Sequence, residues 1–392
     1  MRFIRYDVLA LGLSVCLGIQ IAEAQDEQTA ETAAGGLVRS QLTLAQRPVT
    51  VAFAPTLEVD DPAYRQLLSA RGPASAARVR VGELEGGPLL RVGTLDGSTP
   101  ADAGAGADDA PRPPSTTYDL WLTRTGADWA LEVHAAASDE TAARPDVAGS
   151  IPLSREPAAE AVGSFSAAVV PTADDAGQLV LRWGNHEWTA DFQFADPPER
   201  EAADEESEPP DENPGDVREF DTDTSVIARA SRLAERHEAA IVLPDGARIS
   251  VLYWKELSVE HEDFALIPSV ADGEVVRLTE AAITRLRTEV PLQFGRVTIA
   301  TGNLAQGFPG AYGLWLKRVG HGWRLVFNHE ADSWGTQHDP EFDAAEIELA
   351  YSQGSLSTRP LGVALVPATA RSGQLVIHWG AHEWRADFII PQ

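Results

Sequence analysis

The segment "GQLVIHWGAHEWRADF" (373–388) predicts a complete β-hairpin and therefore a β-rich fold. Gly380 and Ala381 fit a two-residue turn, and the glycine supplies the positive φ that such a turn needs at its first position. Counting outward from the turn sets Trp379 opposite His382, with the following pairs in step. Apolar side chains then fall on one face and polar side chains on the other, which predicts a strand pair with one buried face.

The same hairpin contains His382 and Glu383 side by side between two tryptophans, a His-Glu pair that either performs chemistry or stabilises the turn. The pairing also sets His378 opposite Glu383. A second copy, "GQLVLRWGNHEWTADF" (177–192), sets Arg182 opposite Glu187 at the same place. An arginine cannot replace a histidine as a metal ligand, because its guanidinium has no lone pair to offer. A cation opposite a carboxylate suits a cross-strand ion pair in both copies. We therefore predict that the repeated His-Glu pair is structural.

The similarity between the two parts of the chain extends beyond the hairpin. Residues 118–134, "YDLWLTRTGADWALEVH", match residues 312–328, "YGLWLKRVGHGWRLVFN". Residues 49–59 match residues 249–259 more weakly. The spacing between the copies is far longer than the period of a solenoid repeat. The sequence therefore predicts a tandem duplication of one unit.

Both copies consist of short segments rich in β-branched and aromatic residues and bounded by Gly, Pro, Asp or Asn, which is typical of antiparallel strands. Helical periodicity is limited to brief stretches such as 278–288. We predict an all-β fold of two tandem antiparallel β-sandwich-like domains, with a barrel-like closure as the alternative. The first domain is expected at 37–194 and the second at 219–392.

Two segments lack the apolar residues that a core requires. Residues 196–216, "DPPEREAADEESEPPDENPGD", combine acidic residues with prolines, so the chain repels itself and stays extended. We predict a disordered acidic linker at 195–218. Residues 97–117 are rich in Gly, Ala and Pro, and we predict a flexible loop there within the first domain.

The start of the chain is typical of a secretory signal peptide. Arg2 and Arg5 precede an apolar run at 8–21, and small residues follow at a cleavage site near Ala24. The run is short for a membrane span, and no later apolar stretch is long enough for one. We therefore expect cleavage after residue 24 and a periplasmic or secreted bacterial protein that has no membrane attachment.

Composition narrows the classes of partner. The only cysteine, Cys16, lies in the predicted signal peptide, so the mature chain has no disulfide and no thiolate metal site. The formal net charge of −28 argues against nucleic acid and against anionic membrane surfaces as partners.

The tryptophans fall into two groups. Eight occur at matched places in the two copies, and large aromatic side chains on the apolar face of strands usually fill a core. Trp254 and Trp334 have no counterpart, and are therefore candidate binding residues, for example as stacking surfaces for sugars. The matched, structural set is Trp121, Trp129, Trp183, Trp188, Trp315, Trp323, Trp379 and Trp384.

One connection in the second copy concentrates polar side chains. Residues 328–349, "NHEADSWGTQHDPEFDAAEIEL", crowd imidazoles and carboxylates around Trp334, and such a loop can hold a divalent cation or supply an acid–base group. No zinc or calcium spacing is present, so a solvated connection is the competing interpretation. The candidate ligands are His329, His338, Asp339 and Glu341.

Residues 308–349, followed by "GQLVIHWG", resemble a family of exported bacterial proteins catalogued as domain of unknown function 2911. The resemblance covers roughly 299–388, and the first copy is a more divergent relative. It implies export and a β-rich fold, and it implies no activity and no catalytic residue. The matching positions are Pro309, Gly310, Tyr312, Trp323, Leu325, Val326, Asn328, Trp334, Gly335, Gln337, Asp339, Pro340, Trp379 and Gly380.

Three functions remain open from the sequence. The first is a non-enzymatic module that binds a ligand, such as a glycan, or takes part in an envelope assembly with another protein. The second is a metal-dependent hydrolase or metal-binding protein, for which a divalent cation is the only cofactor considered. The third is a pair of carbohydrate-binding modules. No nucleophile elbow, phosphate loop or dinucleotide motif is present, so we predict no catalytic residues.

Overall fold

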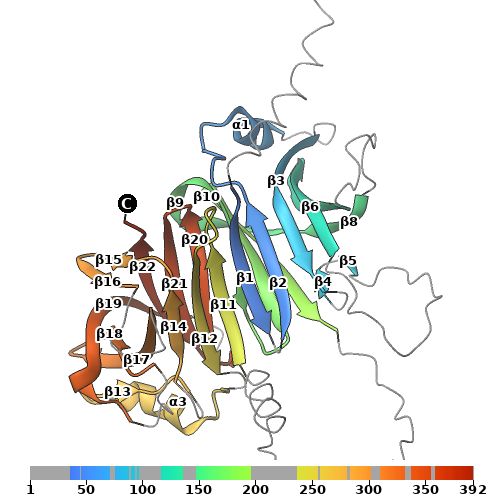
Figure 1. Ribbon diagram of the computed structural model, residues 1–392. Helices are drawn as coiled ribbons and strands as arrows, with labels where there is room; N and C mark the ends of the chain where they lie inside the picture. The colour runs from blue at the N-terminus through green and yellow to red at the C-terminus, as the bar shows by residue number, and fades with distance from the viewer. Residues whose placement is uncertain are drawn as a thin grey trace, which may run out of the picture. The chain divides into compact units, whose positions relative to one another are not determined.

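A computed structural model gives the arrangement of the chain (Figure 1). Residues Leu37–Gln392 form one unit by their internal contacts. The predicted signal peptide, and most of the predicted linker and of the 97–117 loop, lie outside the described residues. The structure describes residues 36–44, 46–70, 76–87, 90–92, 95–96, 116–135, 147–195, 236–254, 257–279, 283–301, 310–331, 337–354 and 358–391.

The predicted all-β fold is confirmed, and its strands are antiparallel throughout the described pairings. The N-terminal half contains β1 (Val38–Leu44), β2 (Arg47–Phe53), α1 (Pro62–Ser69), β3 (Ala76–Gly86), β4 (Leu90–Val92), β5 (Leu95–Asp96), β6 (Thr116–Thr125), β7 (Asp128–Ala135), β8 (Val147–Pro152), β9 (Ser154–Pro171) and β10 (Ala176–Phe194).

The C-terminal half is built in the same manner, with short helical turns in its connections. It contains β11 (Arg236–Val242), β12 (Arg248–Trp254), α3 (Glu262–Leu266), η2 (Ile267–Ser269), β13 (Val275–Val276), β14 (Arg285–Thr288), β15 (Leu292–Phe294), β16 (Val297–Ile299), β17 (Ala311–Val319), β18 (Gly322–Asn328), η3 (Pro340–Phe342), β19 (Asp343–Gln353), β20 (Gly362–Thr369), β21 (Ser372–Trp379) and β22 (His382–Ile389). The segment 278–288, expected to show helical periodicity, contains strand β14 instead.

Each half has a larger and a smaller set of paired strands. In the N-terminal half the orders are β1-β2-β3-β6-β7-β8 and β5-β4-β10-β9. In the C-terminal half the larger order is β11-β12-β14-β17-β18-β19, and β20-β21-β22 form the smaller set with β15 and β16. β19 belongs to both, because its first part pairs with β18 and its last part with β22.

The strand pairings of the two halves correspond in register. Both halves also carry a β-bulge between the same two strands, where one residue is left without a partner. The corresponding pairs include Val38–Phe53 with His237–Tyr253, and Trp121–Glu132 with Trp315–Val326; the bulges follow Val133 and Phe327.

The two halves pair through equivalent strands. β1 lies antiparallel to β11, with Gln41 opposite Ala240 at the centre of the register. On either side of this centre Arg39 faces Val242, and Thr43 faces Glu238. In the smaller sets, β9 and β20 pack together through equivalent small side chains, namely Ala168 and Val170 with Ala364 and Val366. Such a contact of like with like has the form of a two-fold symmetric dimer interface.

The hairpin at 373–388 has the predicted register throughout, from Trp379 opposite His382 to Gly373 opposite Phe388. Gly380 adopts φ +57°, and Gly184 at the equivalent turn adopts φ +61°. The indoles on the apolar face are fully buried in both halves. These are Trp183, Trp188, Trp379 and Trp384.

Trp129 and Trp323 are also buried in the main core. The remaining two matched indoles, Trp121 and Trp315, lie on the other face of their strands. Trp315 is also buried, but it belongs to a small separate cluster, and its counterpart Trp121 is half-buried.

One predicted contact of the hairpin is wrong. His378 is opposite Glu383 in register, yet the imidazole makes no ion pair with it and Glu383 contacts Arg359 and Arg385 instead. His378 is only 1% exposed, with Nε2 3.0 Å from the carbonyl oxygen of Pro171 in the N-terminal half. The sequence pattern assumed that this face is solvated, whereas β9 covers it. The corresponding Arg182–Glu187 pair is confirmed, at 2.7 Å.

None of the helices in the described ranges has the length and apolar character needed to cross a membrane.

Replacing Gly380 with alanine should destabilise the protein by about 3 kcal/mol or more, because the turn requires positive φ and the new Cβ would lie 2.6 Å from the ring of Phe264. Gly320→Ala is the matched control, since Gly320 has φ +56° and open space around its Cβ. Backbone strain alone should cost about 1 kcal/mol there. Urea denaturation measures both changes, and equal losses for the two variants would contradict the contact with Phe264.

Acidification should weaken the contact between the halves. Burial and the nearby Arg359 lower the pKa of His378 to about 3. The unfolded chain then binds a proton near pH 6.5 that the folded protein does not bind, so stability falls as the pH drops from 6.5 towards 3. Between pH 6 and 5, His378→Gln should reduce the slope of unfolding free energy against pH by about 1 kcal/mol per unit. His321→Gln, at an exposed turn, should leave the slope unchanged; a similar reduction in both variants would refute this assignment.

Candidate functional site

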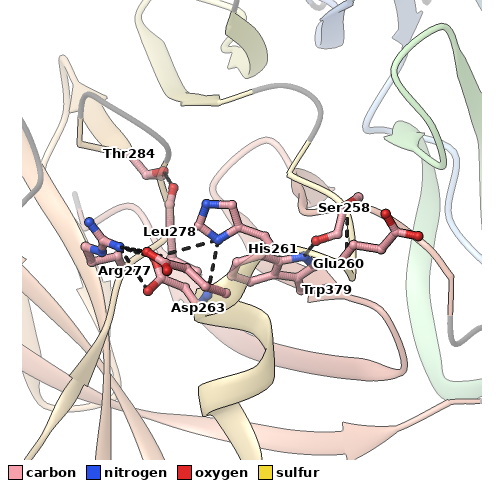
Figure 2. A network of polar contacts seen from close by, with 9 residues as sticks. Ser258, Glu260, His261, Asp263, Arg277, Leu278, Thr284 and Trp379 are labelled. Carbon is pink, nitrogen blue, oxygen red and sulfur yellow. Dashed lines mark hydrogen bonds and ion pairs between the residues drawn. The ribbon is translucent and has the colours of Figure 1, made fainter.

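The C-terminal hairpin holds its tip against a preceding connection of the chain (Figure 2). The indole N–H of Trp379 donates to the carbonyl oxygen of Ser258, at 3.0 Å. His261 caps α3 through the backbone N–H of Asp263, whose buried carboxylate contacts Arg277 at 2.9 Å. These contacts within the chain support a structural interpretation of the network.

The N-terminal half uses a related device at its own hairpin tip. The hydroxyl of Tyr64, in α1, donates to the carbonyl oxygen of Trp183 at 3.1 Å. Gly184 is required beneath it, because an added Cβ would collide with that hydroxyl. In the C-terminal hairpin, His382 Nδ1 contacts the hydroxyl of Tyr351 at 2.6 Å. The His-Glu-Trp elements are thus occupied with packing.

The outer face of the larger C-terminal sheet is the better candidate for a site. Its side chains alternate with those that enter the core, so they point to the other side of the same strands. In register across this face lie Arg285 of β14, Gly313 of β17, Asn328 of β18 and Asp343 of β19. Asn328 is 1% exposed, so this face is covered although it lies outside the main core.

A polar network occupies the β18–β19 end of this outer face. Asn328 Nδ2 donates to Asp343 Oδ1 and to the carbonyl oxygen of Asp339, both at 2.9 Å. The side-chain oxygen of Asn328 accepts the backbone N–H of Glu330 at 2.8 Å. His338 Nε2 lies 2.8 Å from Asp343 Oδ1, and its ring lies 5.3 Å from that of Trp315. We call His338, Asp343 and Asn328 the imidazole network.

Local features of the chain create the imidazole network. The β-bulge after Phe327 shifts the register so that Asn328 meets Asp343, the first residue of β19. Asp339 then caps η3, because its carboxylate accepts the backbone N–H of Glu341 at 3.0 Å. Pro340 begins that turn with its fixed φ. Together these features bring His338, which follows β18 in sequence, next to Asp343 of β19 and Trp315 of β17.

The structure separates the two histidines of the predicted site. His329 packs on Tyr312, and His338 packs on Trp315, which point to opposite faces of β17. His329 Nδ1 is buried and has no hydrogen-bond partner in the described part of the chain. Glu341 is exposed. No group of three histidine, aspartate or glutamate side chains suited to a metal ion occurs among the described residues.

The two predicted tryptophan candidates have different outcomes. Trp334 lies outside the described residues. Trp254, at the end of β12, is half-buried, and the guanidinium of Arg236 lies over its ring at 5.6 Å from the centroid. One face of this indole is therefore covered by a cation. The binding roles of both tryptophans stay predictions.

The N-terminal half has different side chains at the corresponding positions. By strand register, His134 corresponds to Asn328, and Val147 corresponds to Asp343. The counterpart of Arg285 is Glu83, which pairs with Arg80 at 3.0 Å. The combination of Arg285, Asn328 and Asp343 therefore occurs in the C-terminal half and not at the corresponding N-terminal positions.

Sequence reasoning missed part of this arrangement. Asn328 and Asp343 were visible within the polar connection, but their meeting depends on a bulge that carries no local sequence signal. Arg236 and Arg285 were not singled out at all. The strand registers alone relate Glu83 to Arg285, so the change of charge between the two halves could not be seen in the sequence matches.

Residues 270–388 match the family described as "Protein of unknown function (DUF2911)". The match contains the imidazole network and excludes Arg236 and Trp254. The predicted resemblance of the second copy is confirmed, and it begins earlier than residue 299. Neither a curated protein nor a solved structure matches the chain.

Asn328→Ala should destabilise the protein by about 2–3 kcal/mol, because it removes three hydrogen bonds and leaves buried partners unsatisfied. Asn185→Ala, at an exposed hairpin turn, is the matched control and should change stability by less than about 0.5 kcal/mol. Equilibrium urea unfolding provides both values. A loss at Asn328 as small as that at Asn185 would show that the imidazole network does not hold this connection.

Proposed function

We propose that the protein is an exported bacterial binding protein built from a duplicated β unit, whose C-terminal copy carries the ligand-contacting residues. Export to the periplasm or the medium is supported by the charged start, apolar run and small residues of 1–24. The proposal therefore places the ligand outside the cytoplasm.

The duplication is supported at two levels. The sequence matches recur in both halves, and the strand registers and the bulges correspond. The contact of β1 with β11 is also symmetric about Gln41 and Ala240. Two copies of one ancestral subunit that paired in this way would give this result after fusion into a single chain.

The binding role rests on one observation, the contact of 2.8 Å between His338 Nε2 and Asp343. A carboxylate that accepts from Nε2 fixes the imidazole tautomer and leaves Nδ1 as an acceptor. Asp343 also accepts from Asn328, so its orientation is fixed in turn. An oriented imidazole acceptor suits a ligand that donates a hydrogen bond, such as the hydroxyl of a sugar.

The same contact favours a second candidate, a metal-binding protein. Histidine ligands of metals usually donate their other ring N–H to a carboxylate, as His338 is placed to do. The described residues offer no second and third ligand beside it. We therefore favour a glycan or another hydroxyl-bearing ligand. The alternative is a protein that binds a divalent cation and uses it as a hydrolase.

A thermal-unfolding experiment on the purified protein tests this proposal. The probes are maltose, cellobiose and chitobiose for hydroxyl-bearing ligands, and Zn²⁺, Ca²⁺ and Mg²⁺ for the metal alternative. A probe that binds only the folded state raises the unfolding midpoint in proportion to its occupancy. We expect a rise with a sugar, and loss of that rise in His338→Gln.

His321→Gln is the matched control, because His321 is exposed in the β17–β18 turn. This variant should respond as the unmodified protein does. A response to a cation alone would support the metal-binding alternative. A response that survives in His338→Gln would place the ligand elsewhere, and no response to any probe would reject binding of these classes.

A further inference from the structure

The opposite end of the same outer face carries a buried positive charge. Arg236, the first residue of β11, is 8% exposed, and it faces Trp254 across the β11–β12 pair. Arg285 of β14 lies beside Leu252, two positions along β12 on the same face. Burial and the positive charge of Arg285 lower the pKa of Arg236 to about 10.

The described residues supply no carboxylate to neutralise Arg236. The acidic side chain nearest to it on the same face of β11 is Glu238, and that carboxylate pairs with Arg248 at 3.1 Å. Within the described part of the chain, Arg236 contacts the ring of Trp254. A buried charge without a counter-charge is costly, so proteins seldom keep one without a ligand or a partner.

The chemistry of a guanidinium beside an indole suits an oxyanion. A guanidinium stacked on an indole uses its face for the cation–π contact, and its N–H groups point outward in the plane of the group. Those N–H groups match the oxygen atoms of a phosphate or a carboxylate in pairs. The second cation, Arg285, adds attraction for the same negative charge.

The N-terminal half has lost or never had this arrangement. By strand register, Leu37, Ala54 and Glu83 occupy the positions of Arg236, Trp254 and Arg285. All three positive or aromatic groups are thus replaced together, and one is replaced by the opposite charge. The cluster is a coherent set that is specific to one half.

We propose that Arg236, Trp254 and Arg285 form a binding site for an oxyanion, either a phosphate or a carboxylate group of a small ligand. This site is independent of the imidazole network and of the function proposed for it. The overall charge of −28 makes a local cationic pair on a covered face more selective, because most of the surface repels anions.

Thermal unfolding of the purified protein in sodium phosphate, sulfate and acetate tests this site, at constant pH and with sodium chloride holding the ionic strength constant. Phosphate and sulfate stabilise many proteins non-specifically, but that effect does not saturate at low millimolar concentrations. The expected result is a saturable rise in midpoint with at least one oxyanion. Arg236→Gln should weaken that binding at least about tenfold, the effect of losing a charge-assisted hydrogen bond.

Arg285→Gln provides a second test should the first variant not fold, and it should also weaken binding. Arg318→Gln is the matched control, because Arg318 likewise lies over an indole, that of Trp323, at 5.1 Å. It should bind the oxyanion as the unmodified protein does. Saturation with phosphate and sulfate only would assign a tetrahedral ligand, and saturation with acetate as well would assign a carboxylate. The absence of a saturable rise, or its persistence in both Arg236→Gln and Arg285→Gln, would overturn the proposal.

Discussion

Glycine at the hairpin turns sets the register that buries the large indoles. With positive φ at Gly380 the turn closes in two residues, and Gly184 has a similar φ within β10. The indoles beside both glycines are buried. A slip of one residue would exchange the two faces of the strands. It would expose the indoles and bury charged groups such as Glu383. The packing of α1 and α3 against the hairpin tips follows from the same register.

The outer face of the C-terminal sheet separates two kinds of chemistry. One end holds the imidazole network, in which a carboxylate orients His338. The other end holds the cationic pair of Arg236 and Arg285 beside Trp254. Between them lies Gly313, where an added Cβ would collide with Ile283. The imidazole network and the cationic pair therefore lie on one sheet with packed apolar residues between them, so a substitution in one does not directly contact the other.

Local patterns predicted local structure well. The turn glycine and the alternation of side chains were enough to predict the whole register of the hairpin. The sequence matches between the two parts of the chain identified the equivalent strands. Long-range contacts had no such signal. One of the two carbonyl partners of His378 lies more than two hundred positions away in sequence, and Asn328 meets Asp343 only because a bulge shifts the pairing. The short helix α3 also escaped prediction, since five residues cannot display a helical period.

The pairing of equivalent strands within one chain has a consequence for how such a protein can change. Two separate subunits related by symmetry must carry every substitution twice, and they part on dilution. Here the partner is always present at a fixed stoichiometry, so the association does not depend on protein concentration. One half can then acquire new side chains, while the other half keeps only the residues that contact it. The opposite charges of Arg285 and its counterpart Glu83 illustrate that freedom.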